Sequence, residues 1–210
     1  MVMRVAQAMK AAPIFAVLRG ITPDEAVPIG AALVEAGITF LEATCDSPEI
    51  EKTLRILADR YSDRAVIAAG TVLSVDMARR AVAAGATLLV APNFSPSVVA
   101  EANALGAASA PGVVTPSEAF AALETGASML KVFPGDVMTP KAVKSLCAVL
   151  PKGVQIVVTG GIDAGNIPDY LSHGAAGVGV GSALYKPRKP AGAVREDAAH
   201  FVEIAAKARA

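Results

Sequence analysis

Two charged residues of this 210-residue sequence stand inside short apolar segments. Lys131 lies in the segment 129–134 (MLKVFP), and Glu42 lies in the segment 39–44 (TFLEAT). If these segments are buried strands, burial disfavours the ammonium form of Lys131 and frees an amine that can attack a carbonyl carbon. Burial likewise suits Glu42 to exchange protons with a substrate. The alternatives are a lysine that reaches solvent, and a Glu42 that serves only as the ion-pair partner of Lys131 or Arg19.

Two glycine-rich segments in the last third of the chain are suited to bind an anion. The segments 159–162 (TGGI) and 177–182 (GVGVGS) each carry a hydroxyl residue, Thr159 or Ser182. Glycine allows backbone N–H groups to approach a phosphate closely. Each segment alone could be an ordinary turn, but two such segments after neighbouring strands favour a phosphate site.

Arg19 and Thr71 also stand at the ends of apolar segments. Arg19 could hold an anion, and Thr71 could offer its hydroxyl and its N–H to a carboxylate. Capping of a helix is an equal alternative for Thr71. A pocket with one arginine and several N–H donors suits a substrate that carries two negative groups.

The remaining reactive side chains do not suggest a catalytic set. His173 and His200 fall outside the predicted strand ends, and we expect both on the surface. Cys45 follows Glu42 closely, but no histidine stands at a corresponding strand end to activate it. No metal site is expected from the aspartates Asp46, Asp136 and Asp163.

The segments that carry these candidates belong to a series of apolar runs separated by stretches of helical periodicity. Successive runs begin about 20 to 27 residues apart, the length of one strand and one helix. Eight parallel strand–helix units close into a (β/α)8 TIM barrel, in which polar residues at the strand ends meet in one pocket. The eight predicted strands are 13–19, 38–44, 65–71, 87–92, 107–113, 129–133, 154–159 and 177–182.

The flanks and the helix signals complete the predicted architecture. We expect a single barrel domain over residues 1–210, with a short helix at 2–11 that covers its bottom and a last outer helix at 191–208. Pairs such as Thr22-Pro23 and Ser47-Pro48 are typical of helix starts. No linker or shift in composition indicates a second domain.

Composition excludes several classes of protein. Lys plus Arg and Asp plus Glu both number 19, so the net charge is zero and neither nucleic acid nor an anionic membrane is an expected partner. No apolar run is long enough for a bilayer span, and we read no secretion signal. The two cysteines lack metal or redox spacing, which favours a cytoplasmic protein. Only 18% of residues are charged, consistent with a surface partly covered by neighbouring subunits.

Taken in order, these motifs resemble one family over nearly the whole chain. The family comprises the class I aldolases that act on 2-keto-3-deoxy-6-phosphogluconate (KDPG) and 2-keto-3-deoxy-6-phosphogalactonate (KDPGal). The resemblance rests on VLRG at 17–20, Glu42, AGTV at 69–72, APN at 91–93, APG at 110–112, LKVFP at 130–134, TGGI at 159–162 and GVGS at 179–182.

The resemblance implies a role for each motif. Lys131 would form the Schiff base with the keto carbon of pyruvate, and Glu42 would be the general acid/base, acting through a water. Arg19 and Thr71 would hold the carboxylate or orient the substrate, and Phe133 would pack over the reacting carbons. Pro92 and Thr159 would also bind substrate, and the phosphate would lie against Gly160, Gly161, Gly181 and Ser182. No cofactor or metal would be required, and the assembly would be a homotrimer.

The resemblance points more to the KDPGal branch than to the KDPG branch. The segments 21–26, 47–49 and 179–185, and the lack of an arginine shortly after Glu42, look like the KDPGal enzymes, whereas Thr159 looks like the KDPG enzymes. We therefore expect cleavage of KDPGal to pyruvate and D-glyceraldehyde 3-phosphate. The alternatives are KDPG, or both C4 epimers, as substrate. A phosphosugar isomerase or epimerase and a non-catalytic phosphosugar-binding barrel remain as other classes.

Overall fold

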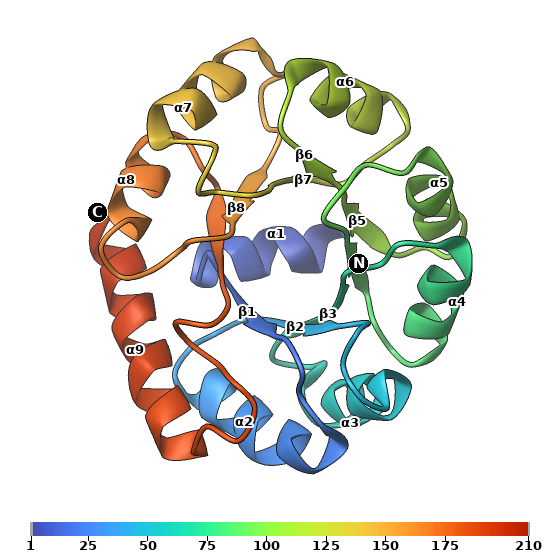
Figure 1. Ribbon diagram of the computed structural model, residues 1–210, viewed down its shortest axis with the longest axis vertical. Helices are drawn as coiled ribbons and strands as arrows, with labels where there is room; N and C mark the ends of the chain where they lie inside the picture. Colours follow the sequence, from blue (N-terminus) through green and yellow to red (C-terminus); the bar gives the residue numbers. More distant parts are fainter. Residues whose placement is uncertain (1, 210) are drawn as a thin grey trace.

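The computed structural model describes residues 2–209, and strands alternate with helices throughout (Figure 1). The strands are β1 (Ile14–Leu18), β2 (Phe40–Thr44), β3 (Val66–Gly70), β4 (Leu88–Val90), β5 (Ala108–Ala110), β6 (Gly112–Val113), β7 (Leu130–Val132), β8 (Ile156–Thr159) and β9 (Gly177–Val180). The helices are α1 (Val2–Ala11), α2 (Pro23–Glu35), α3 (Ile50–Tyr61), α4 (Val75–Ala83), α5 (Pro96–Ala104), α6 (Pro116–Glu124), α7 (Pro140–Val149), α8 (Ile167–Ser172) and α9 (Ala191–Lys207). Apart from β5, each strand is followed by a helix, as in repeated βα units.

The strands form one parallel sheet that bends round into a barrel. Their order is β5-β4-β3-β2-β1-β9-β8-β7-β6, so β5 and β6, which are consecutive in the chain, occupy its two ends. Only Pro111 separates them. The sheet therefore nearly closes on itself, which confirms the predicted (β/α)8 barrel.

The predicted fifth strand, 107–113, is divided into β5 and β6 in the structure. Pro111 has no N–H to donate and its φ angle is fixed, so it interrupts a strand. Its carbonyl oxygen still accepts a hydrogen bond from the Lys131 backbone N–H at 2.9 Å. The structure therefore has two short strands where one strand was predicted, and the number of βα units is unchanged.

The buried apolar residues form two clusters, an inner cluster inside the barrel and an outer cluster between the sheet and the helices. Phe15, Phe40 and Met129 belong to the inner cluster, whereas Leu41 and Leu130 belong to the cluster between the sheet and the helices. The rings of Phe15 and Phe40 stack with their centroids 4.0 Å apart. Since side chains alternate along a strand, Glu42, two residues after Phe40, and Lys131, two residues after Met129, also face inward.

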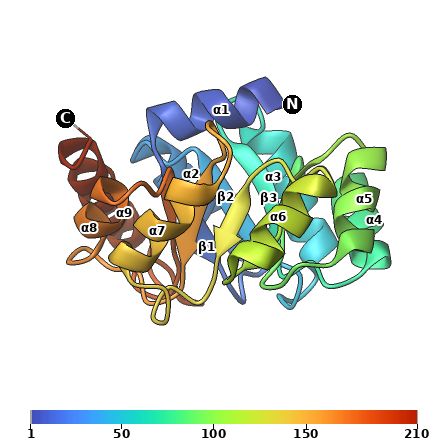
Figure 2. The same cartoon turned by 90° about the horizontal axis from the view of Figure 1, so that it is seen from above.

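Helix α1 lies across one end of the barrel, as predicted (Figure 2). Its Val5 and Met9 side chains join the inner cluster and fill that end. The Thr39 hydroxyl donates to the carbonyl of Ala8 at 3.0 Å, and the Arg209 guanidinium donates to the carbonyl of Met9 at 3.2 Å. The helix therefore seals the amino-terminal side of the strands and leaves the opposite side open.

Helix starts follow the predicted Thr-Pro and Ser-Pro pairs except at one place. Helix α3 begins at Ile50, after Ser47 and Pro48 rather than at them. The N-cap residue of that helix is Glu49, and the Ser47 hydroxyl instead accepts a hydrogen bond from the Gly20 N–H at 2.9 Å. None of the helices in the described range 2–209 is long and apolar enough to cross a membrane.

Candidate active site

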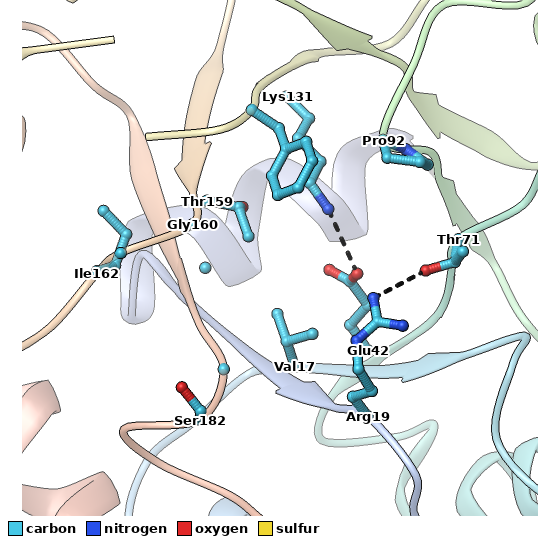
Figure 3. A pocket seen from close by; sticks show the side chains of 14 residues that line it. Val17, Arg19, Glu42, Thr71, Pro92, Lys131, Thr159, Gly160, Ile162 and Ser182 are labelled. Carbon is cyan, nitrogen blue, oxygen red and sulfur yellow. Dashed lines mark hydrogen bonds and ion pairs between the residues drawn. The ribbon is translucent and has the colours of Figure 1, made fainter. Parts of the chain in front are cut away.

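Lys131 and Glu42 point into the open end of the barrel from opposite strands (Figure 3). Lys131 comes from β7 and Glu42 from β2, and their Nζ and Oε1 atoms are 3.7 Å apart. Their side chains are 8% and 2% exposed, so the amine and the carboxyl group lie together away from bulk water. Such a pair provides a nitrogen nucleophile and a proton acceptor within reach of one small substrate.

Gly70 makes the space that the Glu42 carboxylate occupies. A Cβ atom built on Gly70 would lie 2.4 Å from Glu42 Oε1, closer than any real contact allows. Strands β2 and β3 pair in register here, with Glu42 opposite Ala68 and Thr44 opposite Gly70. The glycine at the end of β3 is therefore required by the adjacent carboxylate, a function that its position before Thr71 did not reveal.

Arg19 and Thr71 meet at the same side of the pocket. The Arg19 Nη2 atom donates to the Thr71 hydroxyl at 3.2 Å, and its Nη1 atom pairs with Asp46. Thr71 has a φ angle of 57°, a left-handed conformation that is unusual for a β-branched residue. Strained backbone of this kind is often found at functional sites, where surrounding structure holds it.

The glycine turns form the other side of the pocket. Gly160 and Gly161 have φ angles of 99° and 65°, and the Asn166 side-chain amide donates to the carbonyl of Gly161 at 2.7 Å. A Cβ atom on Gly179 would lie 2.5 Å from the Thr159 hydroxyl, so this glycine makes room for that side chain. Figure 3 shows Ser182 across the pocket from Thr71.

One cavity of about 200 Å³ brings all the predicted site residues together. The ring of Phe133 lies over the amine, with its centroid 5.4 Å from Lys131 Nζ. The predicted residues that line the cavity are Arg19, Glu42, Thr71, Pro92, Lys131, Phe133, Thr159, Gly160, Gly161, Gly181 and Ser182.

Sequence reasoning missed four residues of this region. Val17, Ile162 and Gly179 also line the cavity, and Asp46 holds Arg19 from outside it. Val17 could have been found, since it lies two residues before Arg19 on the same strand face. We considered Asp46 only as a metal ligand, and nothing in its spacing indicates the contact with Arg19.

The other reactive side chains lie elsewhere. Cys45 is outside the cavity, and burial together with the negative charge of Glu51 raises the pKa of its thiol to about 11. His200 is exposed, as predicted, and His173 is half-buried with its Nδ1 atom 2.7 Å from the carbonyl oxygen of Asp169. Within residues 2–209 no group of three or more His, Cys, Asp or Glu side chains is placed to hold a metal ion.

Comparison with known proteins identifies close relatives over most of the chain. A family model described as KDPG and KHG aldolase matches residues 5–197. The 2-dehydro-3-deoxy-6-phosphogalactonate aldolase of Escherichia coli strain K12 is 38% identical over 191 residues, which are 91% of this chain and 93% of that protein.

Solved structures agree with this relationship. A structure described as native KDPGal matches with a TM-score of 0.92 at 38% identity, covering 94% of this chain and 96% of the other. A cube-shaped protein cage designed by fusing symmetric oligomeric domains contains a chain that matches with a TM-score of 0.92 at 37% identity, covering 94% of this chain and 73% of the other.

Proposed function

Because the chain belongs to the KDPG and KHG aldolase family, we propose that it cleaves KDPGal to pyruvate and D-glyceraldehyde 3-phosphate through a Schiff base on Lys131. KDPGal is the compound that the name of the Escherichia coli relative gives as 2-dehydro-3-deoxy-6-phosphogalactonate. The observation that carries the mechanism is the buried contact of Lys131 Nζ with Glu42 Oε1 at 3.7 Å. Family membership favours an aldolase over the isomerase, epimerase and non-catalytic alternatives.

The two buried groups divide the chemistry between them. Lys131 Nζ attacks C2 of the substrate, and loss of water from the adduct gives a protonated imine. Glu42 accepts the proton of the C4 hydroxyl while the C3–C4 bond breaks, and the bonding electrons move into the imine to form an enamine. The aldehyde leaves, Glu42 returns a proton to C3, and water releases pyruvate from Lys131.

The two sides of the pocket suit the two ends of the substrate. Arg19 and Thr71 lie on the Glu42 side, where a guanidinium and a hydroxyl can bind the carboxylate next to C2. The phosphate would lie against the backbone N–H groups of the glycine turns and the Ser182 hydroxyl. Phe133 and Pro92 would cover the reacting carbons and exclude water. The arrangement therefore favours Arg19 as a carboxylate ligand rather than a phosphate ligand.

Release of pyruvate from KDPGal is the direct test. With lactate dehydrogenase and NADH present, we expect steady oxidation of NADH that depends on KDPGal and on the protein. The same assay with KDPG measures the preference between the two C4 epimers. A folded protein that releases no pyruvate from either epimer would contradict the proposal, and equal kcat/KM values would contradict the KDPGal preference alone.

Thr159 is the residue that we expect to limit discrimination between the epimers. Its side chain is buried and lines the cavity. We expect its hydroxyl to bond to O4 in the configuration of KDPG and not in that of KDPGal. Thr159→Val should raise the kcat/KM ratio of KDPGal to KDPG about 10-fold, the value of one lost hydrogen bond. Thr53→Val, at a buried position on α3 outside the cavity, is the matched control and should leave the ratio unchanged. An unchanged ratio in Thr159→Val would exclude this role.

The proposed assembly is a homotrimer. The matching chain of the designed cage comes from a set of symmetric oligomeric domains, which supports self-association. Large apolar side chains are exposed on the monomer surface, among them Leu73 and Val137 at 51% and 66%. We expect the mass of a trimer in light scattering at micromolar concentration, and a monomer there would contradict the proposal.

A further inference from the structure

Asp46 lies in the turn after β2, four residues beyond Glu42, and contacts the guanidinium of Arg19. The contact uses Nη1 of Arg19, while Nη2 of the same group donates to the Thr71 hydroxyl at 3.2 Å. Arg19 lines the cavity and Asp46 does not. The guanidinium is thus held on its outer edge by a carboxylate and presents its other edge to the pocket.

The turn that carries Asp46 is tied to the end of β1. Ser47 accepts a hydrogen bond from the Gly20 N–H at 2.9 Å, and its hydroxyl is 3.2 Å from the hydroxyl of Thr44. Both hydroxyl residues are buried. Because Gly20 follows Arg19 and Ser47 follows Asp46, this buried link sets the distance between the two charged residues. The backbone of Asp46 is therefore held close to the backbone of Arg19.

We propose that Asp46 is a positioning residue, which holds Arg19 so that Nη2 faces Thr71 and the carboxylate end of the substrate. The inference rests on the proposed function, which places the carboxylate at this side of the pocket. Arginine has a long side chain, and that of Arg19 is 60% exposed, so without a partner it would adopt many rotamers. Its planar fork allows one edge to bind Asp46 and the other to bind a second carboxylate.

An alternative role for the same pair is stabilisation of the fold. Exposed ion pairs contribute little to stability, because water screens them and the side chains lose rotamer entropy. The side chains of Arg19 and Asp46 are 60% and 49% exposed, so loss of the contact should scarcely change the melting temperature. A positioning role instead predicts weaker binding of the carboxylate end of the substrate and unchanged binding of the phosphate end.

The rate at which borohydride inactivates the protein in the presence of pyruvate reports how well the carboxylate end of the substrate is bound. We expect the pyruvate concentration for half-maximal inactivation to rise about fivefold in Asp46→Ala, the upper range for an exposed ion pair. In the aldol direction, KM for glyceraldehyde 3-phosphate should stay within about twofold, since its phosphate binds at the glycine turns. Asp63→Asn, an exposed acid paired with Arg64 at the sealed end of the barrel, is the control and should change neither value.

A double-mutant cycle separates positioning from a direct effect of the Asp46 charge. If Asp46 acts through Arg19, Asp46→Ala should have no further effect on pyruvate binding in the Arg19→Ala background. The same fold-change in both backgrounds, an equal change in KM for the aldehyde, or no change at all would overturn the inference. Wild-type protein that borohydride and pyruvate do not inactivate would instead defeat the proposed function, and this inference with it.

Discussion

Lys131→Met should lower kcat/KM for KDPGal cleavage by about 10,000-fold or more and abolish the covalent trapping of pyruvate by borohydride. Lys131 carries the one primary amine among the described residues that line the cavity. Arg19 carries a guanidinium rather than a primary amine, so it cannot replace Lys131 in forming an imine. Methionine has nearly the length of lysine and keeps the contact with the Phe133 ring, so the loss should reflect the missing amine.

Two further variants make this result decisive. Lys131→Arg keeps a positive charge beside Glu42 but forms no imine, and it should be as inactive as Lys131→Met. Lys152→Met removes an exposed lysine from the loop after α7 and should retain full activity and trapping. Mass spectrometry of the trapped wild-type protein should place the pyruvate adduct on Lys131. An adduct on another lysine would contradict the mechanism.

Lys131 was identifiable from the sequence because a single charge in an apolar strand faces a definite side. The alternation at 129–133 separates Lys131 from Leu130 and Val132, and the structure places those two residues in the outer cluster. Glu42 follows the same rule on β2. Local periodicity was sufficient to predict that both residues lie in the site, since in a barrel every inward side chain near the open end reaches the same pocket.

Contacts between loops could not be predicted from the alternation of side chains along a strand. Asp46 and Arg19 are 27 residues apart, and their chain neighbours Ser47 and Gly20 are hydrogen-bonded to each other as well. The later start of α3, at Ile50 rather than at the Ser-Pro pair, belongs to the same turn. Gly70 is a related case, because its lack of a side chain matters only through the neighbouring strand. Alternation predicts which face a residue occupies, but these three features depend on which loops and strands are neighbours.

Glu42→Gln should lower kcat for cleavage by about 100- to 10,000-fold, the usual contribution of a general acid/base. Glutamine has the same shape and can accept a hydrogen bond from Lys131, but it cannot carry the proton of the C4 hydroxyl. Pyruvate should still be trapped on Lys131 by borohydride, more slowly than in the wild type. Exchange of the pyruvate methyl protons with deuterium oxide, which requires proton transfer at C3, should fall with kcat.

Gly70→Ala tests the same group without changing its chemistry. A methyl group at this position would lie 2.4 Å from Glu42 Oε1 and must displace the carboxylate or the end of β3. Proton exchange and cleavage should therefore both decrease, whereas Glu35→Gln, which alters an exposed ion pair with Arg195, should change neither. If Glu42→Gln slows cleavage but leaves proton exchange at the wild-type rate, Glu42 is not the group that moves the C3 proton. Its contact with Lys131 would then serve to place the amine, and another group or a bound water would have to carry the proton.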